Sequence, residues 1–478
     1  MSHTRRTFLK AATAAVAAPF FFPQTVFGAN ETVNIGIVGL GVRGAGEHLP
    51  RFAKQPNVKV VAVADPDRQR TDAAVAKLAK DFSQKADGYA DMRQIFERKD
   101  VDAIGNATMQ YWHALSTIWA CESGKHVFCE KPLSHFIWEG RQMVNAAEKY
   151  NRLIQCGVQN RSCQSALDAR EYIQSGKIGK IKYVTAFANK PRTSIGKRTE
   201  PLPIPATVDY DLWCGPAKDG PVYRDHLQYD CSFTWNMGDG ESVNQGVHEI
   251  DTARRMLGIN ELPRRVISMG GRFVWDDAGD VPNTQIIYFD YPEAPILYEV
   301  HNMRENKDAK SPAPSTLGFG TGIIVHGEAG YVYVVTGRAV AFDAENKQTA
   351  SWSSDDTHFE NFIAAVRSSR REDLNCDVLA GHISTTICNA GNVSYRLGKS
   401  ASVAEQKAAI ADVPFFGEMH DRYLQHIAKH DVDPNTTILG PWLTCDPANE
   451  CFKENVEAAK IVRGWHREPY TVKEVGRT

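Results

Sequence analysis

The feature that most constrains this chain is a glycine-rich turn that follows a short apolar run. Residues 33–38 read VNIGIV, residues 39–44 read GLGVRG, and a helix-like segment continues to Phe52. A strand, a GxGxxG turn and a helix in this order are typical of the first unit of a dinucleotide-binding parallel sheet. A βαβ turn that binds no phosphate is the alternative.

Each glycine of this turn has a physical role in binding a dinucleotide. The first permits the tight turn, the second lets the backbone approach the pyrophosphate, and the third allows close packing of helix on strand. The positive end of the helix attracts the phosphates. The cofactor-binding residues predicted here are Gly39, Gly41, Val42, Arg43 and Gly44.

An acidic residue at the end of the next strand indicates which nucleotide is bound. Residues 58–64 form a second apolar run, and Asp65 follows it directly. A carboxylate at this place can bind both ribose hydroxyls of an adenosine and repels a 2′-phosphate, which favours NAD. Arg68 and Arg70 lie close by, so NADP stays open.

The alternation of strands and helices continues and then changes. Residues 103–108, 125–130 and 153–158 are expected to be strands, with helices between them. After about residue 180 the chain is rich in β-strand patterns with few helices between them. The fold class predicted is therefore α/β, with an N-terminal doubly wound parallel sheet of Rossmann type and a C-terminal α+β domain built on a large, mostly antiparallel sheet.

The N-terminal residues have the order of an export signal. Residues 4–10 read TRRTFLK, residues 11–22 are mostly apolar, and Val26-Phe27-Gly28 offers small residues for cleavage. We expect a twin-arginine signal at 1–28, with a chance Arg-Arg pair as the alternative. The domains predicted are thus the signal at 1–28, the NAD(P)-binding domain at 29–158 and the substrate and oligomerisation domain at 159–478. The mature protein is expected in the periplasm, since this route exports folded proteins.

Composition excludes several classes of partner. The formal net charge is −2 and no block of basic residues occurs, so nucleic acid is not expected as a partner. The ten cysteines have no spacing typical of a zinc site, so we expect no metal and mostly buried thiols. After the signal no stretch approaches the length of a membrane span, so no stable membrane association is expected after export.

Later motifs resemble those of a known family. Residues 130–132 read EKP, 155–159 read QCGVQ, 209–216 read DYDLWCGP and 244–251 read NQGVHEID. Together with the glycine turn they resemble the Gfo/Idh/MocA oxidoreductases, over nearly the whole chain after the signal. The resemblance implies a nicotinamide-dependent enzyme that acts on a sugar or polyol between two domains, often with a cis peptide before Pro132.

Two residues are the catalytic candidates under this resemblance, Lys131 and His248. Oxidation of a secondary alcohol needs a base for the hydroxyl proton and a donor for the developing oxyanion. Glu130 is expected to orient Lys131. If residues 243–257 form one helix, Asn244, His248 and Asp251 share a face, so a partner could orient the imidazole. Many relatives have aspartate where this chain has Asn244, which puts an Asp-His relay in doubt.

Further residues complete the predicted site. Besides the glycine turn and Asp65, the cofactor is expected to contact Thr108, His113, Glu130 and Lys131. The substrate is expected to contact Arg161, Tyr210, Trp213, Trp235, Asn244 and His248, because aromatic faces suit sugar rings.

Three functions remain open at this point. The first is an oxidoreductase or sugar–sugar transhydrogenase with tightly bound NAD, since free NAD is scarce outside the cytoplasm. The second is a redox-neutral glycoside hydrolase or lyase that forms a transient ketone. The third is a noncatalytic sugar-binding protein. A homo-oligomer formed through the exposed sheet face is expected in each case.

Overall fold

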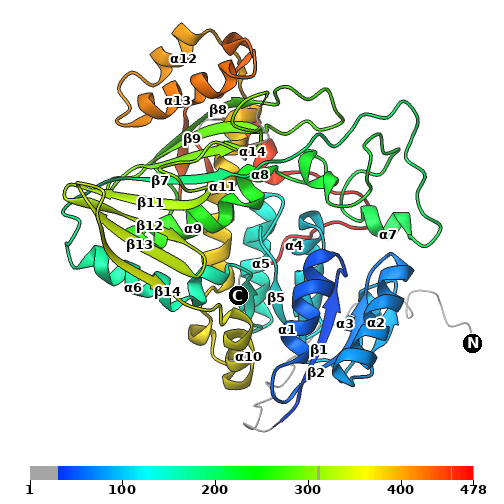
Figure 1. Cartoon of the computed structure of the whole chain (residues 1–478). Coiled ribbons are helices and arrows are strands. Elements are labelled where there is room, and N and C mark those ends of the chain that lie inside the picture. Colours follow the sequence, from blue (N-terminus) through cyan, green and yellow to red (C-terminus); the bar gives the residue numbers. More distant parts are fainter. Residues whose placement is uncertain (1–30, 309–312, 454, 477–478) are drawn as a thin grey trace, which may run out of the picture.

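The computed structural model describes residues 31–308, 313–453 and 455–476, so the predicted export signal lies outside the described residues. The chain forms two halves, each built on one sheet (Figure 1). The N-terminal half contains the glycine turn, and the larger half contains most of the remaining chain.

A parallel sheet of six strands forms the N-terminal half. Its order is β3-β2-β1-β4-β5-β6 and every neighbouring pair is parallel, as the sequence predicts. The central strands are buried, because helices cover both faces of such a sheet. The strands are β1 (Val33–Val38), β2 (Val58–Ala64), β3 (Asp87–Tyr89), β4 (Ala103–Asn106), β5 (His126–Cys129) and β6 (Ile154–Cys156).

The helices of this half follow the strands in βαβ order. The first begins as a π-helical turn, Gly44–His48, and continues as a regular helix, α1 (Leu49–Ala53). The others are α2 (Arg68–Phe82), α3 (Arg93–Phe96), α4 (Gln110–Glu122) and α5 (Ile137–Lys149).

The second half is built on a sheet of twelve strands. The main path runs β14-β13-β12-β11-β7-β10-β9-β8-β16-β15, and only the β7–β10 pair is parallel, which confirms the mostly antiparallel prediction. The long strands are β7 (Ile181–Asn189), β8 (Arg265–Gly271), β9 (Thr284–Asp290), β10 (Ile296–His301), β11 (Thr321–Gly327), β12 (Gly330–Val335), β13 (Arg338–Asp343) and β14 (Gln348–Ser353). The short ones are β15 (Lys399–Ser400), β16 (Ile438–Leu439), β17 (Leu443–Asp446) and β18 (Cys451–Phe452).

Helices flank this sheet, with α9 and α6 against strands of the β7–β14 side and α13 near β9 and β10. The single helix expected over 243–257 is two helices in the structure, because the helix is interrupted at Gln245. The helices are α6 (Gln164–Gln174), α7 (Tyr210–Cys214), α8 (Glu241–Asn244), α9 (Gly246–Leu257), α10 (His358–Ser368), α11 (Val378–Arg396), α12 (Val403–Ala409), α13 (Phe416–Ala428) and α14 (Val456–Arg463).

One late helix belongs to the core of the N-terminal half. Phe359 and Phe362 of α10 are fully buried in a cluster with Phe52 and Phe128. The rings of Phe128 and Phe359 stack with their centroids 4.4 Å apart. Residues far beyond the predicted boundary at 158 therefore complete the hydrophobic core of the nucleotide-binding half.

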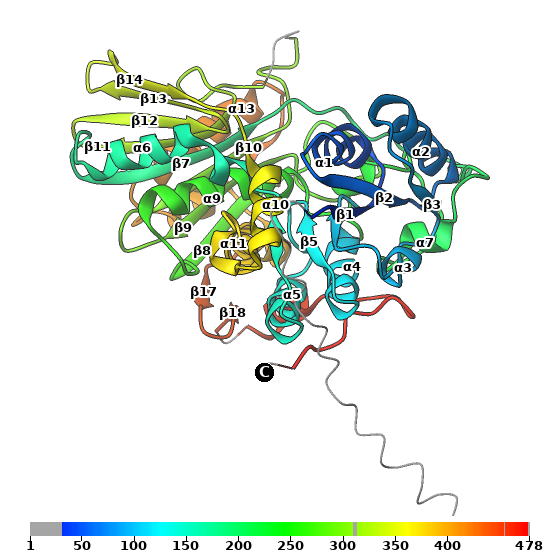
Figure 2. The ribbon, with the colours of Figure 1, turned by 90° about the horizontal axis from the view of Figure 1, so that it is seen from below.

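A long connection from the second half also crosses to the first. After β7 the chain runs to α7, which both ribbon views place beside the N-terminal half (Figures 1 and 2). The Arg68 amide donates to Thr207 O at 2.9 Å, and the Asp209 amide donates to Pro66 O at 2.8 Å. Backbone pairing thus fixes this connection to the loop after β2.

Candidate active site

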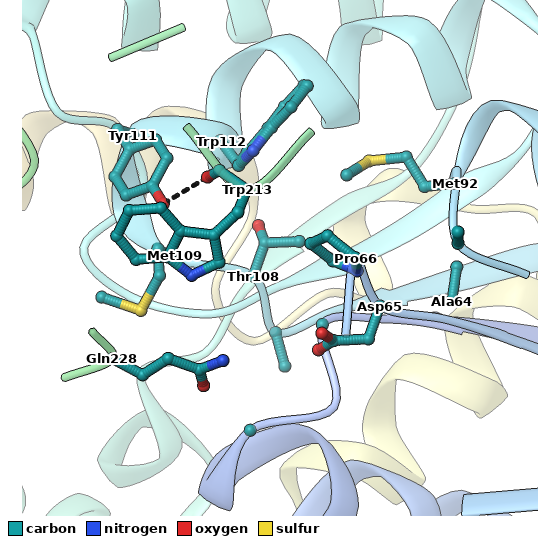
Figure 3. Close-up of a pocket in the computed structure, with 14 residues that line it drawn as sticks. Ala64, Asp65, Pro66, Met92, Thr108, Met109, Tyr111, Trp112, Trp213 and Gln228 are labelled. Carbon is teal, nitrogen blue, oxygen red and sulfur yellow. Dashed lines mark hydrogen bonds between the residues drawn. The ribbon is translucent and has the colours of Figure 1, made fainter. Parts of the chain in front are cut away.

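A pocket lies at the carboxyl ends of the parallel strands, where open α/β sheets bind their ligands (Figure 3). Its empty volume, including the part open to solvent, is about 550 Å³. Most of its wall comes from the N-terminal half, but Trp213 and Gln228 come from the crossing connection. The lining residues are Gly39, Gly41, Ala64, Asp65, Pro66, Ala90, Met92, Ala107, Thr108, Met109, Tyr111, Trp112, Trp213 and Gln228.

The glycine turn has the geometry that a pyrophosphate site needs. Gly39 has φ +80°, and a Cβ there would lie 2.5 Å from the Thr108 amide nitrogen. A Cβ on Gly44 would lie 1.8 Å from Gly39 O, so helix and turn pack as closely as predicted. Gly41 lines the pocket, and a Cβ there would meet Arg70 Nη1 at 3.6 Å, an ordinary contact distance; Val42 is 91% exposed. The turn leaves its backbone accessible to a ligand.

Asp65 lines the pocket beside the glycine turn. Its carboxylate accepts hydrogen bonds from the Leu40 amide at 2.7 Å and the Asp67 amide at 2.9 Å. Burial raises the pKa of Asp65 above its ordinary value, although these two amides favour the charged form. A carboxylate has lone pairs for further donors, so Asp65 is held in place to receive ribose hydroxyls.

Glu130 connects the EKP motif to the glycine turn. Its Oε1 accepts hydrogen bonds from Arg43 Nε at 2.8 Å and from His48 Nε2 at 3.1 Å. Burial alone would raise the pKa of Glu130, but the Arg43 charge and the His48 hydrogen bond outweigh it and hold that pKa far below its ordinary value. Gly157 leaves room for the carboxylate, since a Cβ there would lie 3.0 Å from Oε2. Glu130 therefore positions Arg43.

Thr108 and His113 make hydrogen-bond contacts with the loops that follow β4 and β5, next to the pocket. Thr108 Oγ1 donates to Asn106 Oδ1 at 2.8 Å. His113 is buried, with Nδ1 2.7 Å from Pro132 O and Nε2 3.0 Å from Thr108 O. Both ring nitrogens of His113 are thus used within the protein. The peptide between Lys131 and Pro132 is cis, as the resemblance implies.

Lys131 meets the second half of the chain. Its Nζ donates to Asn244 O at 2.8 Å and to Asn244 Oδ1 at 3.0 Å. Burial lowers the pKa of Lys131 below its ordinary value. An ammonium has three donors, so one remains for a substrate oxygen, and the lowered pKa favours release and uptake of a proton.

His248 lies near Lys131 and is kept neutral. Burial, and then the Lys131 charge, lower the pKa of His248 to about 3. Its Nδ1 is buried and has no hydrogen-bond partner among the described residues. A neutral imidazole can bind a hydroxyl group of a substrate.

The expectation that a helix neighbour orients His248 is wrong. Asp251 instead accepts hydrogen bonds from Arg161 Nε and Nη2, both at 2.8 Å, and from Ser384. Asn244 binds Lys131 and lies in α8, beyond the break at Gln245. The helix break separates Asn244 from His248 and Asp251, which both lie in α9.

The predicted substrate residues lie in several places. Trp213 lines the nucleotide pocket and stacks on Tyr210 with ring centroids 5.7 Å apart. Arg161 is held by Asp251, and Trp235 lies beside Arg396 in a separate small pocket. Among the described residues of this set, only Asn244 and His248 interact with Lys131. Asn244 accepts hydrogen bonds from Lys131, and the Lys131 charge acts on the His248 imidazole. The substrate role of the others stays a prediction.

Sequence reasoning missed several residues of the site, His48 and Gln228 among them. His48 binds Glu130, and Gln228 lines the pocket. Neither belongs to a motif, because His48 follows the glycine turn within a buried π-helical segment and Gln228 lies in a long connection. A metal is not indicated: the described ranges contain no group of three or more His, Cys, Asp or Glu side chains suited to one.

Comparison with known families decides the classification. The oxidoreductase model with an NAD-binding Rossmann fold matches residues 33–158, and the model for the C-terminal alpha/beta domain of the same family matches residues 176–423. The chain belongs to the Gfo/Idh/MocA oxidoreductase family. Its N-terminal half is an NAD-binding Rossmann domain, in agreement with the glycine turn and Asp65.

Curated relatives match mainly part of the chain. It is 31% identical over 160 residues to 2,7-anhydro-N-acetylneuraminate hydratase of Mediterraneibacter gnavus, covering 33% of this chain and 40% of the relative. It is 33% identical over 150 residues to inositol 2-dehydrogenase of Salmonella paratyphi B, covering 31% and 43%. The chain thus spans less than half the length of these relatives.

A solved structure covers more of the fold. The WlbA dehydrogenase from Bordetella pertussis, in complex with NADH and UDP-GlcNAcA, superposes with a TM-score of 0.57 and 18% sequence identity over 77% of this chain and 96% of that one. The likeness supports the two-sheet fold.

Among the described residues no helix is long and apolar enough to cross a membrane. The ten cysteines are all free thiols, and all of them except Cys451 are buried.

Proposed function

We propose that this protein is an NAD-dependent oxidoreductase that acts on a secondary hydroxyl group of a sugar or polyol. The observation that carries the proposal is the juxtaposition of Lys131 and His248 across the two halves. Lys131 has a lowered pKa and His248 is neutral. These two properties are what proton removal and oxyanion stabilisation require.

The residues of the chain divide the work as follows. When bound, NAD supplies the acceptor for the hydride from the substrate carbon. The glycine turn and Arg43 hold its phosphates, and Asp65 holds its ribose. Lys131 Nζ, fixed by its two hydrogen bonds to Asn244, takes the hydroxyl proton in its neutral form and then stabilises the carbonyl oxygen as an ammonium. His248 binds the same hydroxyl group or its neighbour.

The test is turnover of a panel of sugars and polyols by the NAD-loaded protein. Lys131→Met and His248→Ala are compared with Lys182→Gln, a change of an exposed lysine on β7. Loss of a positioned acid or base lowers the rate about 10²–10⁴-fold. We expect such a loss for Lys131→Met and an unchanged rate for the control. A Lys131→Met protein that turns over at the normal rate contradicts the proposal.

We further propose that NAD stays bound and that the mature protein works in the periplasm. The pairing of residues 207–209 with the loop after β2 supports retention of NAD, because it closes one side of the pocket with Trp213. Mass spectrometry of nucleotide released from denatured protein tests retention. Near-stoichiometric NAD or NADH is the expected result, and an empty protein is the contrary one. Fractionation of cells tests the location.

A redox-neutral reaction is the second candidate. It uses the same first step, since a transient ketone acidifies the neighbouring C–H bond and allows elimination or addition. The relative named as a hydratase supports it, because hydration has no net oxidation. Product formation without a net change in NADH distinguishes this candidate. The third alternative is a noncatalytic sugar-binding protein. Such a protein would bind sugars without turnover, and Lys131→Met would leave its sugar affinity unchanged.

We also propose a homo-oligomer that forms through the large sheet. Tyr331 and Phe342 stack on neighbouring strands with ring centroids 4.8 Å apart and are only partly buried. Aromatic side chains on a sheet face suit association with a second copy. Light scattering on the purified protein tests this, and a monomer at micromolar concentration contradicts it.

A further inference from the structure

A group of charged side chains borders Lys131 and has no role in the proposed proton transfer. It comprises Lys190 and Arg192, just after β7, and Glu241 at the start of α8. The Glu241 side chain is fully buried, whereas that of Lys190 is 43% exposed. The group therefore extends from the interior to a position that solvent reaches.

The two cations of this group share one carboxylate. Arg192 takes both oxygens of Glu241, with Nη2 at 3.0 and 2.8 Å from Oε1 and Oε2 and Nε at 3.0 Å from Oε2. Lys190 Nζ lies 4.0 Å from Oε1 of the same carboxylate. A bidentate arginine saturates a carboxylate more completely than a lysine does. The Lys190 charge is thus only partly compensated.

A neutral amide fixes the position of the Lys190 ammonium. Lys190 Nζ donates to Gln245 Oε1 at 3.0 Å, while Gln245 Nε2 donates to Glu249 Oε1 at 2.9 Å. The second bond sets which end of the Gln245 amide faces the lysine. Burial raises the pKa of Glu249 to about 8, so its carboxyl is largely uncharged at neutral pH and does not offset the ammonium.

Contacts place Lys190 close to the reacting group. Gln245 directly follows Asn244, which binds Lys131 Nζ. Although burial dominates the pKa of Lys131, the charges of Glu241 and Lys190 also act on it. An ammonium with three donors uses one on Gln245, so donors remain for a bound molecule that touches Lys131.

An aromatic ring stands beside these cations. Tyr229 is 48% exposed, and its backbone has φ +65°. The preceding residue, Gln228, lines the nucleotide pocket. The Arg192 guanidinium lies 5.4 Å from the ring centroid. A bulky residue in this backbone region is strained, and such strain collects at functional sites. A sugar ring can pack on an exposed ring of this kind.

We infer that Lys190 binds an anionic substituent of the substrate, so that the sugar is an acidic one: a uronic acid, or a sulfate or phosphate ester. The inference rests on the proposed function, since it assigns the substrate class of the same site. A compact ammonium recognises each of these anions as a point charge. Gln245 positions Lys190, and Arg192 positions Tyr229. Neither Gln245 nor Arg192 is itself catalytic.

Binding by the NAD-loaded protein tests the inference. Calorimetry compares glucuronate, galacturonate and the sulfate and phosphate esters of glucose with glucose and galactose. We expect at least one anionic probe to bind about tenfold or more tightly than its neutral parent, because a hydrogen bond to a charged group is worth about 1.5–3 kcal/mol and each 1.4 kcal/mol is tenfold. Lys190→Gln removes that preference, Lys190→Arg keeps most of it, and Lys182→Gln leaves it unchanged.

The outcomes separate this inference from the proposed function. Equal binding of neutral and anionic probes, an anion preference that survives in Lys190→Gln, or no binding of any probe overturns the inference. Reduction of bound NAD by neutral sugars without anion preference overturns it while the proposed reaction stands. Binding of an anionic probe through Lys190, with no reduction of NAD by any probe, supports the inference and refutes the proposed reaction.

Discussion

Phe359 joins a late helix to the core of the nucleotide-binding half, so its truncation has a predictable cost. The side chain is fully buried and stacks on Phe128 at 4.4 Å. Its ring also meets Phe52 at 5.0 Å and His48 at 5.1 Å. Truncation of a buried Phe to Ala costs about 3–5 kcal/mol, since it leaves a cavity as well as losing contacts. At roughly 2–4 °C per kcal/mol, the melting temperature of Phe359→Ala falls by about 6–20 °C.

Urea denaturation and thermal melting, each with saturating NAD, measure this loss. Phe82→Ala is the matched control, because Phe82 is a partly buried aromatic at the end of α2 in the same half. It is expected to lose about 1 kcal/mol. Phe359→Leu should lose less than Phe359→Ala, because it refills most of the cavity. A Phe359→Ala protein within about 1 kcal/mol of the wild type would refute the role of α10 in this core.

Three further predictions concern the site. Gly44→Ala abolishes NAD binding in a dialysis assay, because its Cβ would lie 1.8 Å from Gly39 O, whereas Gly46→Ala, with nothing within 4 Å, binds normally. Asp65→Ser lowers the NAD/NADP affinity ratio about tenfold or more, measured by calorimetry, since it removes a carboxylate that repels a 2′-phosphate; an unchanged ratio argues against Asp65 as the ribose ligand. Sugar oxidation rises with pH through the pKa of Lys131, which lies below 10.5, and shows no inflection near pH 6.5, because the pKa of His248 is about 3. A step near pH 6.5 that disappears in His248→Ala contradicts the neutral imidazole.

Local patterns predicted the parts of the fold that depend on local physics. The glycine turn, the strand that ends in Asp65 and the alternation of strands and helices each follow from short-range sterics and burial. The mostly antiparallel character of the second sheet also followed from β-rich runs separated by turns. The family resemblance supplied Lys131 and His248, and the structure brings both to one place with Asn244.

Features that depend on distant contacts could not be predicted. Asp251 lies on the same helix as His248, as expected. Its two carboxylate oxygens, however, accept hydrogen bonds from the Arg161 guanidinium, a partner that the sequence does not reveal. The helix break at Gln245 has no Pro or other strong signal, although Gly246 follows it. The insertion of α10 into the other half depends on pairing of Phe359 with Phe128, which no spacing in the sequence reveals.

The polar surroundings of Lys131 show the same limit. Lys190 and Glu241 lie far apart in the chain and meet only in the folded structure. A charge surplus at such a place depends on how many carboxylates the fold brings there and on which of them are protonated. It therefore emerges from the tertiary structure and not from the composition of any one segment.

In the proposed reaction, hydride transfer to bound NAD depends on Lys131. The most direct measurement mixes NAD-loaded protein with each sugar in a stopped-flow instrument and follows the near-ultraviolet absorbance of the reduced nicotinamide. We expect a single-turnover increase with at least one sugar, slowed by deuterium at the reacting carbon and about 10²–10⁴-fold slower in Lys131→Met. Sugar conversion with no reduced nicotinamide at any time, or a wild-type rate in Lys131→Met, would contradict it.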